Sequence, residues 1–177
     1  MMFEDVVVAG SGGQGVMFVG QLLAYAAMSE GLEVTWIPSY GPEMRGGTAH
    51  CFVVISDRPI GSPLVQDPKL AIVFNEPSFA KYEPLVAPHG LLVINKSIVT
   101  RTSQRRDLTL LPIPASEIAS GCGDRRVINM VLLGAALAVR PILPLAAVRR
   151  ALEQHLPAKH RICCRSISMR LNAVLVC

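Results

Sequence analysis

The chain has 177 residues, of which 51% are hydrophobic, 17% are charged and only 5% are aromatic. That length predicts a single domain, residues 1–177, with a sizeable core. The scarcity of aromatic residues and a net charge of only +4 argue against nucleic-acid binding. The longest strongly apolar stretch, 130–139, is far shorter than the roughly 20 residues of a membrane span. The apolar composition instead favours a surface that is partly buried against partner proteins.

The first predicted elements are a strand at 5–9 and a helix at about 15–30, joined by a glycine-rich turn. The turn reads Gly10-Ser11-Gly12-Gly13-Gln14-Gly15, with the spacing G-x-G-x-x-G. Glycine tolerates positive φ, and a helix that begins here offers unpaired N–H groups and a partial positive charge to an anion. We predict an anion-binding turn in which Gly12, Gly13 or both have backbone conformations closed to other residues. The N–H groups near Gln14 and Gly15 are then expected to face outward. The alternative is a turn that only lets strand and helix pack tightly.

The next strand, at 32–37, bears on whether this turn binds a dinucleotide. A dinucleotide-binding domain needs an acidic residue at the end of that strand to hold the ribose. Glu33 is at its start and Glu43 lies in the following loop, so neither is well placed. A stand-alone nucleotide-binding module or NAD(P)-dependent oxidoreductase is therefore the minor alternative.

A second glycine-framed loop follows this strand and carries one cation. Its residues are Tyr40, Gly41, Pro42, Glu43, Met44, Arg45, Gly46, Gly47 and Thr48. In a parallel sheet this loop and the glycine turn both emerge at the carboxyl edge, so we expect them to be neighbours in space. The planar fork of Arg45 suits a phosphate or a carboxylate. The other interpretation is that Arg45 pairs with an acidic residue of the loop or of a partner subunit.

The rest of the chain alternates strands and helices. A strand at 50–56 follows with no helix before it, so it is expected elsewhere in the sheet or antiparallel. A short return segment is predicted at 60–63. Strands are predicted at 70–74, 91–94 and 108–113, and helices at 78–85, 127–139, 145–156 and 167–175. Ser78 is expected to be the cap or the first residue of the helix at 78–85. We therefore predict an α/β fold, a single-domain open, mostly parallel sheet with helices on both faces, Rossmann-like, that admits one antiparallel strand or hairpin.

No catalytic or metal-binding constellation is evident. The five cysteines, Cys51, Cys122, Cys163, Cys164 and Cys177, contain no C-x-x-C spacing, so no metal site is predicted. Reduced thiols in a cytoplasmic protein are the expected state. His50 and Cys51 are adjacent in a predicted strand and should point to opposite faces, so they cannot form a simple nucleophile–base pair. No catalytic residue is assigned.

The order of these motifs resembles the gamma subunit of 2-oxoacid:ferredoxin oxidoreductases. The likeness rests on the glycine turn at 10–15 and the loop Pro38-Ser39-Tyr40-Gly41-Pro42-Glu43-Met44-Arg45-Gly46-Gly47, and continues through 55–63, 75–78 and 129–135. It covers the chain to about residue 140. The sequence of the loop is most similar to that of the 2-oxoglutarate and branched-chain 2-oxoacid types of this oxidoreductase.

The resemblance implies a multi-subunit enzyme that oxidatively decarboxylates a 2-oxoacid to an acyl-CoA and reduces ferredoxin. It implies thiamine diphosphate, Mg²⁺ and 4Fe-4S clusters on alpha and beta subunits, and on a ferredoxin-like delta subunit where one is present. It implies that this chain is a non-catalytic subunit, inactive alone, which completes the complex and helps to bind coenzyme A. The same resemblance leaves the particular 2-oxoacid open.

Overall fold

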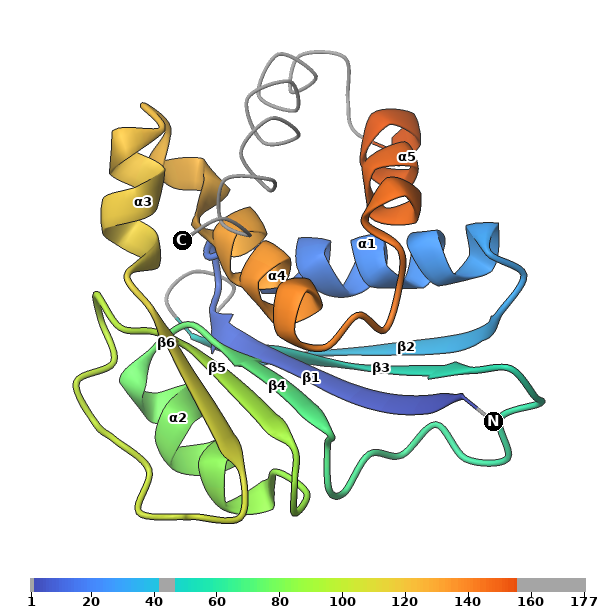
Figure 1. Ribbon diagram of the computed structural model, residues 1–177, viewed down its shortest axis with the longest axis horizontal. Helices are drawn as coiled ribbons and strands as arrows, with labels where there is room; N and C mark the ends of the chain where they lie inside the picture. Colours follow the sequence, from blue (N-terminus) through green and yellow to red (C-terminus); the bar gives the residue numbers. More distant parts are fainter. Residues whose placement is uncertain (1, 42–46, 156–177) are drawn as a thin grey trace.

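A single six-stranded sheet forms the centre of the computed structural model, which describes residues 2–41 and 47–155. Its strands are β1 (Phe3–Ser11), β2 (Glu33–Tyr40), β3 (Thr48–Ser56), β4 (Leu70–Val73), β5 (Leu91–Asn95) and β6 (Thr109–Ile113). They lie in the order β2-β3-β1-β4-β5-β6 (Figure 1). β1, β4, β5 and β6 are parallel neighbours, whereas β3 pairs antiparallel with both β1 and β2. The predicted mostly parallel sheet with one antiparallel strand is confirmed.

The short connection between β2 and β3 explains why β3 runs against the other strands. Only residues 41–47 separate the two strands, which is too short for the crossover that parallel neighbours need. β3 therefore folds back along β2 and then pairs along its whole length with β1, from Ser56 opposite Phe3 to Thr48 opposite Ser11. This places the end of the β2–β3 connection beside the end of β1.

Helices cover both faces of the sheet (Figure 1). The helical segments are α1 (Val16–Ser29), α2 (Glu76–Tyr82), the 3-10 turn η1 (Glu83–Leu85), α3 (Ala115–Gly121), the 3-10 turn η2 (Arg125–Val127), α4 (Ile128–Val139) and α5 (Leu145–His155). α1, α4 and α5 share one core with the sheet, and α2 packs on the opposite face. None of the helices within the described ranges is long and apolar enough to span a bilayer.

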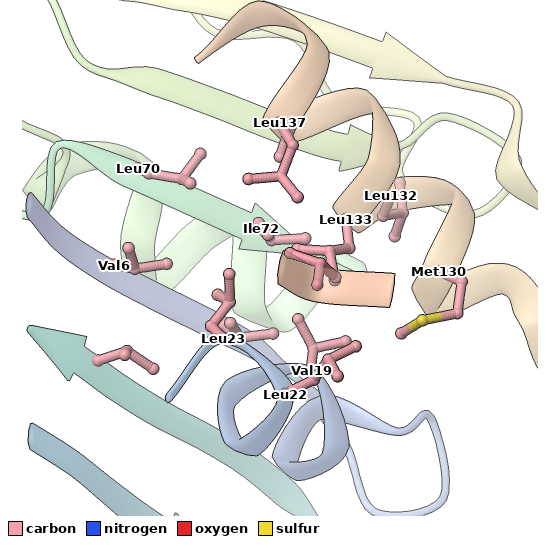
Figure 2. Packing of buried hydrophobic residues seen from close by; sticks show 14 of the residues in the cluster. Val6, Val19, Leu22, Leu23, Leu70, Ile72, Met130, Leu132, Leu133 and Leu137 are labelled. Atoms are coloured by element: carbon pink, nitrogen blue, oxygen red, sulfur yellow. The ribbon is translucent and has the colours of Figure 1, made fainter. Parts of the chain in front are cut away.

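Two buried clusters separate along β1 because successive side chains of a strand point to opposite faces. Val6 and Val8 face the larger cluster with α1, α4 and α5, whereas Val7 and Ala9 face the smaller cluster with α2. Figure 2 shows the larger cluster, in which Leu23 of α1 lies with Ile72 of β4 and Leu133 of α4. All three of these side chains are essentially inaccessible to solvent. This packing therefore holds α1, which follows the glycine turn in the chain, in place against the sheet.

Three expectations about single elements need correction. The cap of α2 is Asn75 rather than Ser78, since the Asn75 side chain accepts a hydrogen bond from the Ser78 N–H at 3.0 Å. Residues 57–69 form an irregular connection, so the short return segment expected at 60–63 adds no strand to the sheet. α3 was not predicted, because its short sequence has no side-chain cap and buries only Ala115 and Ala119. The helix expected at 167–175 lies outside the described residues.

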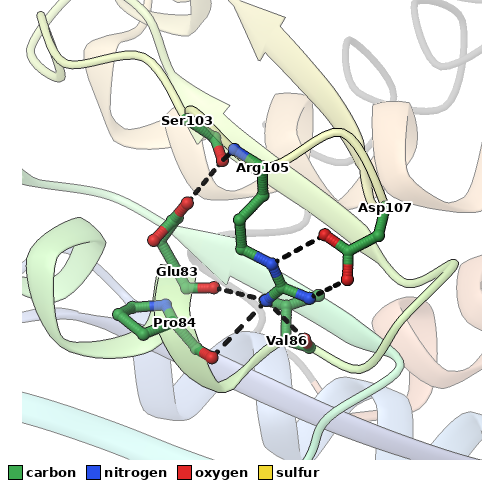
Figure 3. A network of polar contacts seen from close by, with 6 residues as sticks. All are labelled: Glu83, Pro84, Val86, Ser103, Arg105 and Asp107. Atoms are coloured by element: carbon green, nitrogen blue, oxygen red, sulfur yellow. Dashed lines mark hydrogen bonds and ion pairs between the residues drawn. The ribbon is translucent and has the colours of Figure 1, made fainter.

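A polar network fastens the loop before β6 to the end of α2 (Figure 3). Arg105 donates through Nη1 to the carbonyl oxygens of Glu83 at 3.1 Å and Val86 at 2.7 Å. Its Nε and Nη2 atoms donate to the carboxylate of Asp107 at 2.9 and 2.6 Å, and Ser103 donates to the Glu83 carboxylate. One guanidinium thus donates to backbone carbonyls at the end of the helical segment and to the carboxylate of Asp107.

This network predicts a pH dependence of stability. The hydrogen bond from Arg105 lowers the pKa of Asp107 below its ordinary value of 3.8. A carboxyl group whose pKa is lower in the folded state than in the unfolded state stabilises the fold at pH values above its unfolded-state pKa. This stabilisation is lost as the pH falls through the folded-state pKa. Asp107→Asn should therefore lower the free energy of unfolding at pH 7, and this difference from wild type should shrink below about pH 4. Urea unfolding at several pH values measures it.

The control for this prediction repeats Asp107→Asn in a chain that also carries Arg105→Met. Without the guanidinium, the effect of Asp107→Asn should lose its dependence on pH. A destabilisation by Asp107→Asn that is the same at pH 3 and pH 7 in the otherwise wild-type chain would contradict this role for the ion pair.

Candidate functional site

The glycine turn joins β1 to α1 at the carboxyl edge of the parallel strands. Gly13 has φ 95° and Gly15 has φ 78°, whereas Gly12 is not among the described glycines with positive φ. The prediction that Gly12, Gly13 or both have such a conformation is confirmed, and Gly13 is the residue that has it. Gly15 is the N-cap of α1, and the Val19 N–H bonds to its carbonyl at 3.1 Å.

Hydrogen bonds within the protein occupy several of the N–H groups of the turn itself. The Ser11 N–H donates to Gln14 Oε1 at 2.7 Å, and the Gln14 N–H donates to the Ser11 carbonyl at 3.1 Å. The Gly12 N–H donates to the Gly47 carbonyl at 2.9 Å. The expectation that the Gln14 N–H faces outward is therefore wrong, because the side chain and backbone of Gln14 close the turn on itself. The donors that remain for an anion are those in the first turn of α1, which have no partner within the helix.

Asn75 ties the end of β4 to this turn. Its Nδ2 atom donates to Ser11 Oγ at 2.8 Å and to Gln14 Oε1 at 3.3 Å, while its Oδ1 atom caps α2. Only 9% of the residue is exposed. Asn75 belongs to the stretch 75–78 of the family likeness, and the sequence predicts no role for it. The available signal was its position directly after a buried strand that neighbours β1.

Asn129, at the start of α4, reaches the same turn from the other side. A Cβ atom at position 15 would lie only 2.3 Å from Asn129 Nδ2, so the two residues are in close contact. Asn129 is 8% exposed, and its Oδ1 atom accepts a hydrogen bond from the Met130 N–H at 2.9 Å. Three segments that are distant in sequence therefore meet at the start of α1.

The base of the second glycine-framed loop also lies here. Gly47 bonds to Gly12 as described, Thr48 pairs with Ser11, and the Gly41 N–H donates to the Thr48 carbonyl at 2.8 Å. The prediction that loop and turn are neighbours is confirmed, although the route is different, since β2 does not adjoin β1 and β3 makes the connection. Tyr40 and Thr48 belong to strand ends rather than to the loop. The remaining loop residues, Pro42, Glu43, Met44, Arg45 and Gly46, lie outside the described residues.

His50 and Cys51 point to opposite faces of β3, as predicted. Cys51 lies in the larger core, where burial raises the pKa of its thiol to about 11, so the thiol is protonated at neutral pH. His50 packs against the rings of Phe52 and Tyr82, with centroid separations of 5.5 and 5.7 Å. Burial and the nearby Lys81 lower the pKa of His50, which favours a neutral imidazole. The two side chains therefore do not form a nucleophile–base pair.

Within residues 2–41 and 47–155, no group of three or more His, Cys, Asp or Glu side chains is arranged to hold a metal ion. Cys163, Cys164 and Cys177 lie outside these ranges. The two described cysteines, Cys51 and Cys122, are free thiols. The prediction that this chain has no metal site of its own stays a prediction.

Fold and site together define an α/β domain that presents a glycine-rich strand–helix turn and three converging segments at one sheet edge. The chain belongs to the pyruvate ferredoxin/flavodoxin oxidoreductase family, whose sequence profile matches residues 5–172. The family resemblance inferred from the motifs is thereby confirmed.

Two relatives show how this chain compares in length. It is 42% identical over 134 residues to ketoisovalerate oxidoreductase subunit VorA of Methanothermobacter marburgensis, and the match covers 76% of this chain but only 28% of VorA. It is 30% identical over 159 residues to 2-oxoglutarate synthase subunit KorC of Methanocaldococcus jannaschii, covering 88% of this chain and 85% of KorC. The chain thus spans about a quarter of the first relative and most of the second.

Solved structures share the fold. The gamma subunit of a keto/oxoacid ferredoxin oxidoreductase from Geobacter sulfurreducens superposes with a TM-score of 0.85 at 23% identity, over 99% of this chain and 98% of that chain. The 2-oxoglutarate:ferredoxin oxidoreductase of Magnetococcus marinus, solved with 2-oxoglutarate, coenzyme A and succinyl-CoA, gives 0.87 at 22% identity. It covers 99% of this chain and 31% of that chain. In one relative the fold is therefore nearly a whole subunit, and in the other it is part of a longer chain.

Proposed function

We propose that this chain is the gamma subunit of a 2-oxoacid:ferredoxin oxidoreductase, which converts a 2-oxoacid to an acyl-CoA and reduces ferredoxin. The observation that carries the proposal is the family match over residues 5–172, together with a KorC relative of nearly the same extent. 2-Oxoglutarate is the first candidate substrate, because that relative is a subunit of 2-oxoglutarate synthase. A branched-chain 2-oxoacid is the second, because the 42% identical relative is a ketoisovalerate oxidoreductase subunit.

In this proposal the chain is a non-catalytic subunit in the cytoplasm. Two observations support that role: His50 and Cys51 lie on opposite faces of the sheet, and the Cys51 thiol has a raised pKa. Thiamine diphosphate, Mg²⁺ and 4Fe-4S clusters would belong to alpha and beta subunits, and to a ferredoxin-like delta subunit if one is present. The chain on its own should then be inactive.

The proposed contribution of this chain to the reaction is binding of an anionic group of a substrate. Coenzyme A carries phosphates and a 2-oxoacid carries a carboxylate, and both suit a helix N-terminus. The candidate residues are the glycine turn at 10–15 and the loop at 40–48 with Arg45. Arg45 stays in the proposal because the Gly47–Gly12 hydrogen bond holds the base of its loop against the turn. A stand-alone NAD(P)-dependent enzyme is not favoured, since the family match accounts for the same turn.

The test is purification of the tagged chain from cells that produce it. We expect alpha and beta subunits to co-purify and the complex to reduce ferredoxin with coenzyme A and 2-oxoglutarate. 3-Methyl-2-oxobutanoate, assayed in parallel, decides between the two substrate candidates. The chain produced alone should show neither 2-oxoacid oxidation nor iron–sulfur absorbance. A chain that purifies alone and oxidises NAD(P)H or a 2-oxoacid by itself would refute the proposal.

A further inference from the structure

We propose that two copies of this chain associate through β2, by antiparallel pairing of their β2 strands about a two-fold axis at Thr35. The pairing would join the two sheets into one continuous sheet. It goes beyond the proposed function, which names partner subunits but no second copy of this chain.

β2 is the outermost strand of the sheet, and one of its sides carries unpaired backbone groups (Figure 1). It pairs with β3 only, and within the described residues no strand pairs with its outer side. Protein edge strands usually carry a lysine, a proline or a bulge, or are very short, because a free edge invites another strand. β2 has eight residues, with Glu33 as its only charged side chain and Pro38 near its end. The stretch 33–37 therefore lacks these forms of protection.

The pairing with β3 determines which backbone groups of β2 point outward. Along an antiparallel strand, residues alternately bond to the neighbouring strand and turn both backbone groups away from it. The Gly41 N–H bonds to the Thr48 carbonyl at 2.8 Å, and this alternation turns Val34, Trp36 and Pro38 outward. Pro38 agrees, because a proline in an edge strand has its ring nitrogen on the outer side. Val34 and Trp36 thus offer an N–H and a C=O to a further strand.

A two-fold axis at Thr35 uses all of these groups. It places Val34 of each copy opposite Trp36 of the other, and each such pair exchanges two backbone hydrogen bonds. Pro38 then lies beyond the paired stretch. An axis at Trp36 would place Val34 opposite Pro38, which has no N–H to donate. Both side chains are half-buried in the single chain, and a β-branched residue opposite an aromatic one is a favourable cross-strand pair.

The hydroxyl of Thr35 supports the same register. Thr35 Oγ1 is buried and has no hydrogen-bond partner among the described residues. Leaving a buried hydroxyl unpaired costs free energy. The axis places Thr35 opposite Thr35 of the second copy, and a hydrogen bond between two such threonines stabilises paired strands. Glu33 lies opposite Ile37, so the two carboxylates do not face each other.

Disulfide cross-linking tests the register directly, on the protein in the assembly in which it purifies. Directly opposite residues that exchange no backbone bonds have Cα atoms about 4.5 Å apart, within the range of a disulfide. We therefore expect Thr35→Cys to give a covalent dimer of this chain under mild oxidation. Ile37→Cys is the matched control on the same strand and face, because its two copies would be about 13 Å apart along the strands. The wild-type chain gives the background from its five cysteines.

Sedimentation velocity over a range of concentrations tests the association itself. The paired stretch is short, so we expect a dissociation constant roughly in the micromolar range. Val34→Pro removes an outward N–H from each copy and should raise this constant by about tenfold or more, while the bonds between β2 and β3 remain.

Leu110→Pro makes the matching change in β6, the strand at the other edge. The Thr109 N–H bonds to the Gly90 carbonyl at 2.8 Å, so the N–H of Leu110 points outward. Leu110 is partly buried against the smaller cluster, as Val34 is against the larger one. It should change the dissociation constant by less than about twofold. Circular dichroism checks that both variants fold, and the cysteine pair decides if either does not.

The inference is wrong if the wild-type chain does not self-associate at any concentration, or if Ile37→Cys cross-links as readily as Thr35→Cys. It is also wrong if Thr35→Cys cross-links to a different subunit, which would then be the occupant of this edge. These outcomes are separate from failure of the proposed function. A chain that purifies without alpha and beta subunits, yet cross-links to itself through Thr35→Cys, would refute the assignment as a gamma subunit and leave the dimer standing.

Discussion

Gly15→Ala should lower the free energy of unfolding by about 2–4 kcal/mol, because two costs act at one residue. The backbone of Gly15 has φ 78°, where a side chain strains the chain. The new Cβ atom would also lie 2.3 Å from Nδ2 and 3.2 Å from Cγ of Asn129, so the carboxamide must move. Urea unfolding followed by circular dichroism measures the loss.

Gly13→Ala is the matched control, since it introduces the same methyl group in the same turn. Gly13 has φ 95°, but nothing lies within 4 Å of a Cβ atom there. Only the backbone strain should remain, with a loss of about 1–2 kcal/mol. Equal losses at the two positions would show that Asn129 does not crowd Gly15.

Leu23→Ala should lower the free energy of unfolding by about 2–5 kcal/mol, the range for a buried leucine that leaves a cavity. Leu23 is fully buried in the larger cluster, where α1 packs on the sheet beside α4 (Figure 2). The close packing around it leaves little room for neighbours to fill the cavity. Chemical denaturation of the purified chain, with the slope compared between variants, gives the value.

Leu64→Ala makes the same change on the surface and serves as the control. Leu64 is 74% exposed, so the change in unfolding free energy should stay within about 0.5 kcal/mol. A loss at Leu23 as small as the loss at Leu64 would contradict the position of α1 in the core. It would also undermine the site, because the start of α1 is held in place by this packing.

The sequence alone determined those features that depend on neighbours in the chain. The uninterrupted apolar run at 70–74 is typical of a strand buried on both faces, and β4 is observed there at the centre of the sheet beside β1. The glycine turn and the start of α1 were predicted because their signals, glycine spacing and helical periodicity, are local. The family was predicted for the same reason, since each of its motifs is a contiguous stretch of the sequence.

Only the tertiary structure decided how the site is assembled. The sequence placed β3 in either of two arrangements, and its pairing between β1 and β2 brought Gly47 to Gly12. Asn75 and Asn129 were not assigned to the site, because they are 60 or more positions from the turn and no local pattern reports such contacts. Gln14 was expected to leave its N–H free, and the turn instead bonds it to Ser11. Hydrogen bonds between distant segments depend on strand order and helix packing, which the whole chain settles together.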